Sequence, residues 1–375
     1  MKRANTIIIL FGLVSLFADI TYESARSILG PYIGILGGSI ALAGIAGGLG
    51  EMIAYSLRTI TGYIADKFKS YWFFTILGYI IGLFSIPIMG FCQSATQVFI
   101  LSQTERLGKA LRNPSRDYLI STVSTKYGRS FALHEAIDQI GAVIGPILVA
   151  IIVSYAGYSA ALKLMIIPTT ISILLLIATK KIYSDEMKKF SDDKTIVPKT
   201  QSENQNNKDK LKTYITFAFL TNLGFINFQI ISFHFKSSGL SDFWIPIAYA
   251  IAMLVDSITA IPFGILFDRK PILTLSFIPI FGFASSFSLL NPVSIIFWGA
   301  YMGLSESILK SGLAKISRKA TSFGILHFSS GISSLISSVI FSKIYDFGIN
   351  WIILFSLITQ ALSLFVLIKN LERFK

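Results

Sequence analysis

Long apolar runs alternate with short polar connections over nearly the whole chain. Each run is close to the ~20 residues that an α-helix needs to cross a bilayer. Lipid offers no hydrogen-bonding partner to a bare backbone, so spans of this length are helical. The sequence therefore predicts an all-α polytopic membrane protein. Its twelve predicted spans are 6–29, 38–61, 71–92, 96–120, 131–154, 158–179, 212–234, 243–263, 271–290, 293–315, 322–344 and 349–369.

Composition agrees with a chain that is solvated by lipid. Charged residues make up 14% of the 375 residues, whereas a soluble domain carries about 25%. The net charge of +13 comes from basic residues that lie mostly between the apolar runs, so it indicates orientation in a membrane rather than binding to nucleic acid. The sequence has no GxxxxGK[ST] phosphate loop, no histidines at zinc-ligand spacing and one cysteine, Cys92. We therefore expect no ATP-driven pump, no metal, no cofactor and no intrachain disulfide.

The distribution of lysine and arginine predicts the topology. When the N-terminus is placed inside, basic residues fall in the inner connections, and the outer connections around 30–37, 93–96, 155–157 and 291–292 have none. Lys236 and Lys343 are the only outer exceptions. The positive-inside rule then places both termini in the cytoplasm. We expect a multi-pass protein of the plasma (inner) membrane. The runs at 96–120, 131–154 and 293–315 are the least apolar and are included because this alternation requires them.

One hydrophilic segment divides the chain. Residues 180–211 are rich in Lys, Asp, Asn, Gln and Ser and cannot bury a core, so we predict a cytoplasmic linker. It separates a six-helix bundle at 1–179 from a second at 212–375. Two similar halves match the repeat architecture of secondary transporters, whose substrate site lies near mid-membrane between the repeats.

Charged residues inside the predicted spans require an explanation, because placing one charged side chain at bilayer depth costs at least ~2.5 kcal/mol of free energy. In four spans of the first half they recur every three, four or seven residues and so share one helical face. Ion pairs between spans and functional groups both explain such faces, and the two readings stay open here. The residues are Asp19, Glu23 and Arg26; Glu51 and Arg58; Glu105, Lys109, Arg112 and Arg116; and Glu135 and Asp138.

A short motif recurs at equivalent places in the two halves. Gly62-Tyr63-Ile64-Ala65-Asp66-Lys67 follows the second run, and Gly264-Ile265-Leu266-Phe267-Asp268-Arg269 follows the eighth. We expect polar loops here, with the glycine in a tight turn. The motif resembles the loop signature of the major facilitator superfamily, which lies between spans 2 and 3 and is echoed between spans 8 and 9.

This resemblance implies two six-helix bundles around a central cavity lined by spans 1, 2, 4 and 5 of the first half. It also implies a small-molecule substrate and a monomer in the lipid bilayer. The cytoplasmic gate that it suggests, in which bonds form in one state and break in the other, comprises Gly62, Asp66, Lys67, Arg116, Asp117, Asp268 and Arg269.

The fifth span carries Gly141-Ala142-Val143-Ile144-Gly145-Pro146. Glycines four apart give a flat face for close helix packing, and Pro146 kinks the helix. The pattern resembles the span-5 signature of proton-coupled drug antiporters in the superfamily, although the usual flanking glycines are missing. Span 4 departs further, because the run from Glu105 to Asp117 replaces the usual arginine and glycine signature and looks like that of a prokaryotic subgroup.

Function follows from the buried charges together with this resemblance. A carboxyl group in an apolar cavity can bind and release protons near neutral pH, which makes Asp19, Glu23 and Asp138 the candidates for proton coupling. The leading prediction is proton-coupled antiport, with efflux of a small, amphipathic or cationic organic molecule. Substrate-cavity candidates are Arg58, Lys109, Arg112 and Glu135.

Other functions remain open at this point. Arg58, Lys109 and Arg112 would instead bind an organic anion such as a phosphate ester or a carboxylate. A neutral, sugar-like substrate is less expected, since no cluster of Asn and Gln dominates the spans. A non-transporting sensor or subunit is a further alternative, and we expect no enzyme.

Overall fold

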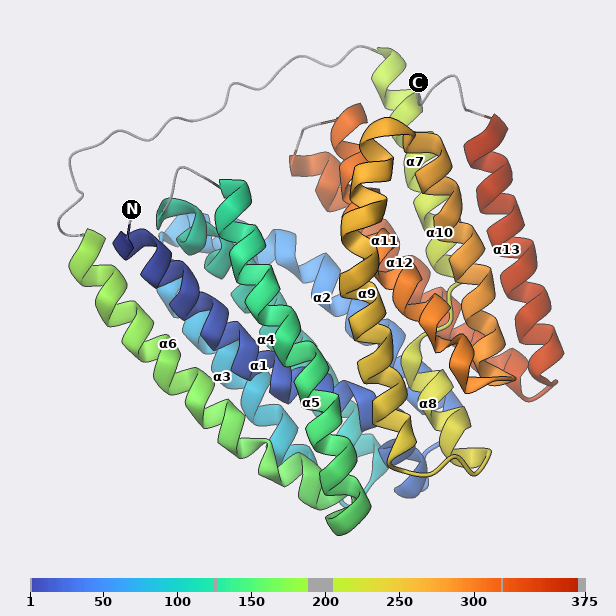
Figure 1. Cartoon of the computed structure of the whole chain (residues 1–375), viewed down its shortest axis with the longest axis horizontal. Coiled ribbons are helices and arrows are strands. Elements are labelled where there is room, and N and C mark those ends of the chain that lie inside the picture. Colours follow the sequence, from blue (N-terminus) through green and yellow to red (C-terminus); the bar gives the residue numbers. More distant parts are fainter. Residues whose placement is uncertain (1, 124–126, 188–204, 318–319, 370–375) are drawn as a thin grey trace. The chain divides into compact units, whose positions relative to one another are not determined.

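The computed structural model describes residues 2–123, 127–187, 205–317 and 320–369. Figure 1 shows that these residues form helices and no strands. The helices are α1 (Lys2–Ile35), α2 (Ile40–Phe68), α3 (Tyr71–Met89), α4 (Ala95–Val123), α5 (Tyr127–Leu164), α6 (Ile166–Met187), α7 (Gln205–Leu223), α8 (Phe228–Ser237), α9 (Trp244–Arg269), α10 (Pro271–Ser285), α11 (Ile295–Ile316), α12 (Ala320–Tyr345) and α13 (Ile349–Lys369), with 3₁₀ turns η1 (Ser286–Leu289) and η2 (Pro292–Ser294).

The helices follow the predicted spans closely. Nine stretches of the described residues are long and apolar enough to cross a membrane. The stretches α4 and α11 are not among them, and α5 and α6 count as one stretch, Ala136–Ser184. Between the fifth and sixth predicted spans the backbone turns at Gly157, whose φ of 78° favours glycine.

Contacts between Cα atoms divide the chain into two compact units. Unit 1 comprises Met1–Ala25, Leu57–Cys92 and Ile100–Gln201; unit 2 comprises Arg26–Ser56, Gln93–Phe99 and Ser202–Lys375. The long helices α1 and α2 therefore contribute residues to both units. Most of the predicted linker, residues 188–204, lies outside the described part of the chain.

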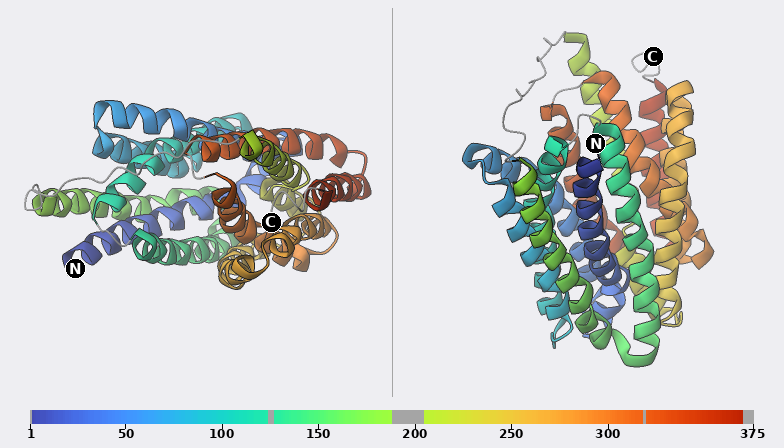
Figure 2. Two further views of the ribbon diagram at one scale, coloured as in Figure 1. Left: turned by 90° about the horizontal axis from the view of Figure 1, so that it is seen from above. Right: turned by 60° about the vertical axis from the view of Figure 1, so that its left-hand side comes forward.

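Glycine allows the helices of unit 1 to approach closely. The right-hand view of Figure 2 shows α1 (dark blue) beside α5. At Gly145 of α5, an added Cβ would lie 2.6 Å from the backbone oxygen of Ile20 of α1, and at Gly141 it would overlap the backbone oxygen of Leu16. Likewise, α3 and α4 cross at Gly82 and Gly108. The Gly141–Gly145 pair therefore lies directly against the backbone of α1.

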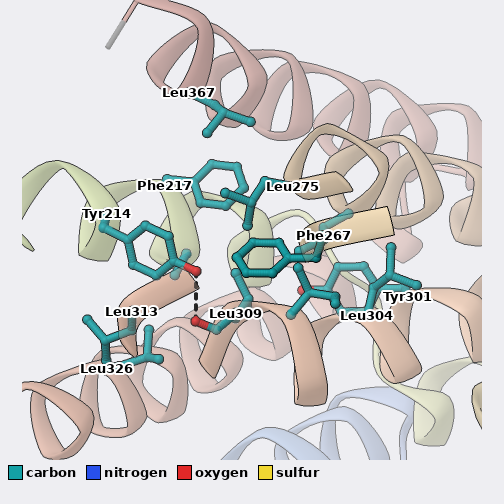
Figure 3. Packing of buried hydrophobic residues seen from close by; sticks show 13 residues of the cluster. Tyr214, Phe217, Phe267, Leu275, Tyr301, Leu304, Leu309, Leu313, Leu326 and Leu367 are labelled. Carbon is teal, nitrogen blue, oxygen red and sulfur yellow. Dashed lines mark hydrogen bonds between the residues drawn. The ribbon is translucent and has the colours of Figure 1, made fainter. Parts of the chain in front are cut away.

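Unit 2 has a large apolar core formed by helices α7 and α9 to α13 (Figure 3). The Tyr214 ring is fully buried, and its hydroxyl donates a hydrogen bond of 2.7 Å to the carbonyl oxygen of Leu309. A buried tyrosine hydroxyl needs such a partner. The core also includes Phe217, Phe267, Leu275, Ile278, Tyr301, Leu304, Ile308, Leu313, Leu326 and Leu367.

The two recurring motifs are helical, so the expectation of polar loops with a glycine turn is wrong. Helix α2 continues to Phe68 and α9 to Arg269, which places Gly62 and Asp66 inside a helix. The tight turn comes later, at Lys69, which has a φ of 49°. Gly62 instead faces Pro114 of α4, 3.4 Å from where its Cβ would be.

Candidate functional site

Unit 1 encloses a buried arginine on α4. Arg112 is 1% exposed, and its guanidinium carbon lies 4.7 Å from the ring centre of Tyr22 on α1 and 4.3 Å from that of Tyr79 on α3. Desolvated cation–π contacts of this kind contribute about 2 kcal/mol. The Nε and Nη1 atoms of Arg112 have no hydrogen-bond partner among the described residues. Two aromatic rings therefore hold a cation whose hydrogen-bonding capacity is only partly used.

The predicted proton-coupling carboxylates gather beside this arginine. Asp19 and Glu23 on α1 are 9% and 4% exposed. The Asp19 carboxyl group interacts electrostatically with Asp138, Glu23, Lys109 and Arg112, which lie on α5, α1 and α4. The close approach of α1 and α5 brings the acids of both helices together.

A second polar network lies in the same unit. The Arg116 guanidinium donates to Asp117 Oδ1 from Nε at 3.0 Å and from Nη2 at 2.8 Å, and Nη1 donates to Ser15 Oγ at 3.4 Å. Ser15 Oγ also lies 3.0 Å from His134 Nε2 and 3.3 Å from Tyr79 Oη. This network joins α1, α3, α4 and α5.

The other charged residues of the predicted gate are exposed. Asp66 is exposed and accepts a hydrogen bond of 2.9 Å from the Tyr71 hydroxyl. Lys67 is exposed, with its ammonium 5.8 Å from the Phe68 ring centre. Asp268 and Arg269 are exposed in the last turn of α9, in unit 2.

The remaining substrate candidates are only partly placed. Lys109 is half-buried and interacts electrostatically with Asp19. Arg58 is half-buried one turn before Thr61, whose hydroxyl donates to the Ala110 carbonyl of α4 at 2.8 Å. The side chain of Glu135 lies outside the described part of the chain, although its backbone belongs to α5.

Unit 2 contains a pocket of about 90 Å³, to which residues of α1, α2, α7, α8, α11 and α12 contribute. Its lining combines charged groups, amides, serines and aromatic rings. The lining residues are Arg26, Gly47, Glu51, Tyr55, Asn222, Phe225, Asn227, Phe228, Gln229, Trp298, Tyr301, Met302, Ser305, Glu306, Ser330 and Ser334. All of them belong to unit 2.

The pocket lies at a break in the seventh predicted span. Helix α7 ends at Leu223 and α8 begins at Phe228, so the carbonyl groups of the residues between them lack helical partners. The carbonyl oxygen of Gly224 accepts from Ser356, that of Phe225 from Ser337 and that of Ile226 from the Trp298 indole, at 2.8, 2.9 and 3.0 Å. Non-helical backbone at membrane depth persists only where such partners exist.

Asn227 stabilises the start of α8 after this break. Its Oδ1 accepts from the Ile230 backbone N–H at 3.0 Å, as an N-cap does. Its Nδ2 donates to Ser338 Oγ at 2.7 Å and to the Gly44 carbonyl of α2 at 3.0 Å. The break is thus tied to both α12 and α2 within unit 2.

The charged part of the pocket includes an ion pair. Arg26 of α1 and Glu51 of α2 approach to 3.5 Å, with side chains 15% and 30% exposed. Glu306 on α11 also lines the pocket and is exposed. The carboxylates that line this pocket therefore outnumber the guanidinium two to one.

Sequence reasoning did not single out most of this pocket. Of the lining residues, the sequence analysis named only Arg26 and Glu51. If span 7 is read as one helix, Asn222 and Gln229 share a face, but Asn227 lies on another. A usable signal is Gly224 followed by Asn227 inside an apolar run, since glycine and an N-cap residue mark a helix break. The structure thus brings together the Asn and Gln cluster that the sequence analysis did not find.

Helical spans, charges buried among them and a polar pocket at a helix break are typical of multi-pass membrane transporters. Residues 10–338 match the sequence profile of the Major Facilitator Superfamily. The chain belongs to that superfamily, as the recurring motif had indicated.

Relatives and solved structures agree with this assignment. The chain is 31% identical over 370 residues to an uncharacterized protein of Mycobacterium tuberculosis, covering 94% of this chain and 90% of the relative. It is 29% identical over 348 residues to an uncharacterized MFS-type transporter of Methanocaldococcus jannaschii, covering 88% and 86%.

Two crystal structures share the fold. The nucleoside transporter NupG aligns with a TM-score of 0.70 at 13% identity, covering 98% of this chain and 99% of that one. A POT family transporter in complex with 5-aminolevulinic acid aligns with a TM-score of 0.77 at 14% identity, covering 98% and 96%.

Proposed function

We propose that this protein is a secondary active transporter that exchanges a small organic molecule for protons by alternating access. The observation that carries the proposal is the group of Asp19 and Glu23, both buried, and Asp138, half-buried, beside Lys109 and Arg112. Acidic groups within an apolar bundle are expensive and mark proton or ion pathways. Efflux is the proposed direction.

The balance of charge explains how such a group would bind a proton. Asp19, Glu23 and Asp138 interact here with Lys109 and Arg112, and Asp138 also interacts with Arg116, whose charge Asp117 compensates, so one proton brings the group closer to neutrality. Carboxyl groups that are grouped in this way among apolar helices are suited to proton transfer. Uptake and release of this proton would change the balance of ion pairs between α1, α4 and α5, as a conformational switch requires.

The relatives support transport of a small solute but do not identify it. The structural neighbours are a nucleoside transporter and a transporter that binds 5-aminolevulinic acid, and at 13–14% identity they indicate the fold alone. We place the protein in the plasma membrane as a monomer with both termini in the cytoplasm, because of its positive inner connections. Asp66, Lys67, Arg116 and Asp117, with Asp268 and Arg269 in unit 2, remain the proposed cytoplasmic gate.

A second candidate function is transport of an organic anion. It is favoured by Arg112, whose Nε and Nη1 have no partner among the described residues and would suit a carboxylate or phosphate oxygen. Access argues against it, since Arg112 is 1% exposed and lies between two rings.

Inverted membrane vesicles with an imposed pH gradient test both candidates. One panel of lipophilic cations and one of phosphorylated or carboxylated anions are added, and collapse of the gradient is recorded. We expect cations to collapse the gradient, Asp19→Asn to abolish the response and Asp346→Asn, an exposed site outside the pocket, to keep it. Collapse by anions that is lost in Arg112→Ala would establish the second candidate. No response to either panel would count against proton-coupled exchange.

A further inference from the structure

Gln229 on α8 is a buried polar residue whose side-chain amide has no partner in the described part of the chain. The residue is 4% exposed and lines the pocket of unit 2. Its backbone oxygen accepts from Ser232 Oγ at 3.3 Å, but its side chain makes no hydrogen bond to any described residue. Native proteins pair nearly all buried polar groups, because an unpaired one costs free energy. An unpaired amide in the wall of a pocket therefore indicates that the pocket supplies its partner.

The packing around Gln229 holds this amide in place. Gly30 of α1 lies directly against the Gln229 backbone oxygen, so no side chain fits between the two helices there. Gly47 of α2 lies against the end of the side chain, where an added Cβ would be 2.5 Å from Gln229 Oε1 and 2.9 Å from Cδ. An amide that is already held in one position loses little freedom when it binds a ligand.

The other amides of the pocket are engaged. Asn222 accepts from the Tyr301 hydroxyl and donates to Ser330 Oγ. Asn227 caps α8 and bonds to α2 and α12. The Ser305 hydroxyl donates to the carbonyl group one turn earlier in α11, at 3.0 Å. Gln229 is therefore the amide of this pocket that remains for a ligand.

The charged side chains of the pocket also have partners. Arg26 and Glu51 approach each other to 3.5 Å. Glu306 interacts with another described residue as well. A charged ligand would compete with these interactions, whereas an uncharged ligand leaves them in place. The pocket therefore favours a neutral group that forms hydrogen bonds with Gln229.

The chemistry of the Gln229 side chain selects among neutral groups. A carboxamide carries a carbonyl acceptor and an NH₂ donor on neighbouring atoms, and a second carboxamide matches both at once. A ketone or a carboxylate offers acceptors alone and an amidinium offers donors alone, so each leaves one half of the Gln229 amide unpaired. The half-buried hydroxyl of Ser334, which lines the same pocket, is available as a further partner.

The size of the pocket limits the ligand further. An engineered apolar cavity of about 150 Å³ takes up benzene. The space here is about 90 Å³, which at the same packing takes about four non-hydrogen atoms. One carboxamide group with the carbon to which it is attached fills such a space. The rings of Phe225 and Trp298 also line the pocket and offer that carbon an apolar surface.

We propose that this pocket binds the uncharged carboxamide group of a small solute, and that Gln229 recognises it by two hydrogen bonds. The proposal goes beyond the proposed function, since it assigns a ligand group to the pocket of unit 2 and does not require proton movement. The break between α7 and α8 places Gln229 in the first turn of α8, at the wall of the pocket.

Four probes of one shape separate hydrogen bonding from charge. Acetamide, acetone, acetate and acetamidinium share a planar skeleton and differ in their donors, acceptors and charge. Their dissociation constants with the purified full-length protein are measured by saturation-transfer difference NMR on the methyl signals, without any pH gradient. We expect acetamide to bind at least about tenfold more tightly than each of the other three. No binding of acetamide, or equal binding of any other probe, would overturn the proposal.

Variants of Gln229 locate the site. Gln229→Met keeps the length of the side chain, introduces no charge and removes both hydrogen-bonding groups, so acetamide should bind at least about tenfold more weakly. Gln229→Glu keeps the shape and replaces the donor by a second acceptor. It should reverse the order, with acetamidinium bound more tightly than acetamide, because a carboxylate pairs with an amidinium through two charge-assisted bonds. Unchanged acetamide binding in Gln229→Met would refute the role of Gln229.

A matched control tests whether overall charge explains such a reversal. Gln97→Glu makes the same substitution at an exposed site of unit 2 outside the pocket and should leave the order of the four probes unchanged. Equal effects of Gln97→Glu and Gln229→Glu would show that the probes respond to the charge of the protein and would refute the site.

Acetamide binding and proton movement are measured separately, so the pocket and the transport function can fail independently. Acetamide binding that is lost in Gln229→Met, with no proton movement in vesicles, would uphold the pocket and refute proton-coupled exchange. Proton movement driven by other solutes, with no acetamide binding, would uphold the transporter and refute this ligand class.

Discussion

The contact between α1 and α5 gives the sharpest test of the packing in unit 1. Gly145 of α5 lies so close to α1 that an added Cβ would be 2.6 Å from the Ile20 backbone oxygen and 3.0 Å from Ile20 Cα. Carbon–oxygen contacts normally lie at about 3.3–3.6 Å. Gly145→Ala would therefore force the two helices apart by roughly 0.7–1 Å, since a backbone oxygen cannot rotate away.

The expected cost follows from this displacement. Overpacking of a tight contact costs about 1–3 kcal/mol, and a rigid backbone neighbour belongs in the upper part of that range. Alanine recovers about 1 kcal/mol of helix propensity over glycine. The net loss is then about 1–2 kcal/mol, or about 2–8 °C in the melting temperature at about 2–4 °C per kcal/mol.

A matched control lies on α9. Gly264 is also inside a helix, and an added Cβ there would meet nothing within 4 Å. Thermal unfolding of the purified variants in detergent should place Gly145→Ala below the parent protein and Gly264→Ala at or above it. If both variants melt with the parent, α1 and α5 do not pack through this glycine, and the account of unit 1 fails.

Three further predictions concern turns, the outer surface and the helix break. Lys69→Gly should raise the melting temperature slightly, because a left-handed conformation costs other residues about 1–2 kcal/mol, whereas Lys69→Val should lower it. Burial raises the pKa of the Cys92 thiol, so the rate of its labelling by an impermeant maleimide should keep rising with pH beyond about 8.5, where the rate for a free thiol levels off. The same reagent should label Cys92 from outside intact cells, and labelling only from the cytoplasmic side would reverse the predicted topology. Ser356→Ala should lower the free energy of unfolding by about 1–3 kcal/mol, because the Gly224 carbonyl would lose its side-chain donor. Ser311→Ala, on an exposed face, should leave stability unchanged. Equal melting temperatures of the two variants would contradict the role of Ser356.

Local patterns predicted the helices well. An apolar run of about 20 residues must be helical in lipid, so the ends of α3 and α13 fall within a few residues of the predicted ends. The stretches α4 and α11 carry too many polar residues for a hydropathy criterion, and only the alternation of sides revealed them. The motif at Gly62 was placed in a loop because its residues suit a turn, whereas α2 continues through them to Phe68 and Gly62 packs against Pro114 of α4.

The helix break could not be deduced in the same way. Helix α7 can end at Leu223 because the carbonyl groups of the next three residues accept hydrogen bonds from side chains. The donors are Ser337, Ser356 and Trp298. These donors lie on α11, α12 and α13, more than 70 positions away in the chain. No local propensity encodes such partners, so the pocket at the break appears only when the fold is known.

Helix α1 links the two sites covalently. Asp19 and Glu23 belong to the acidic group of unit 1, and Arg26 belongs to the pocket of unit 2. Their spacing of four and three residues places all three on one face of the same continuous helix. A shift of α1 on protonation of Asp19 would therefore also move Arg26 relative to Glu51. Such a shift would alter the Arg26–Glu51 pair in the pocket, which is a physical link that the proposed exchange of a substrate for protons would need.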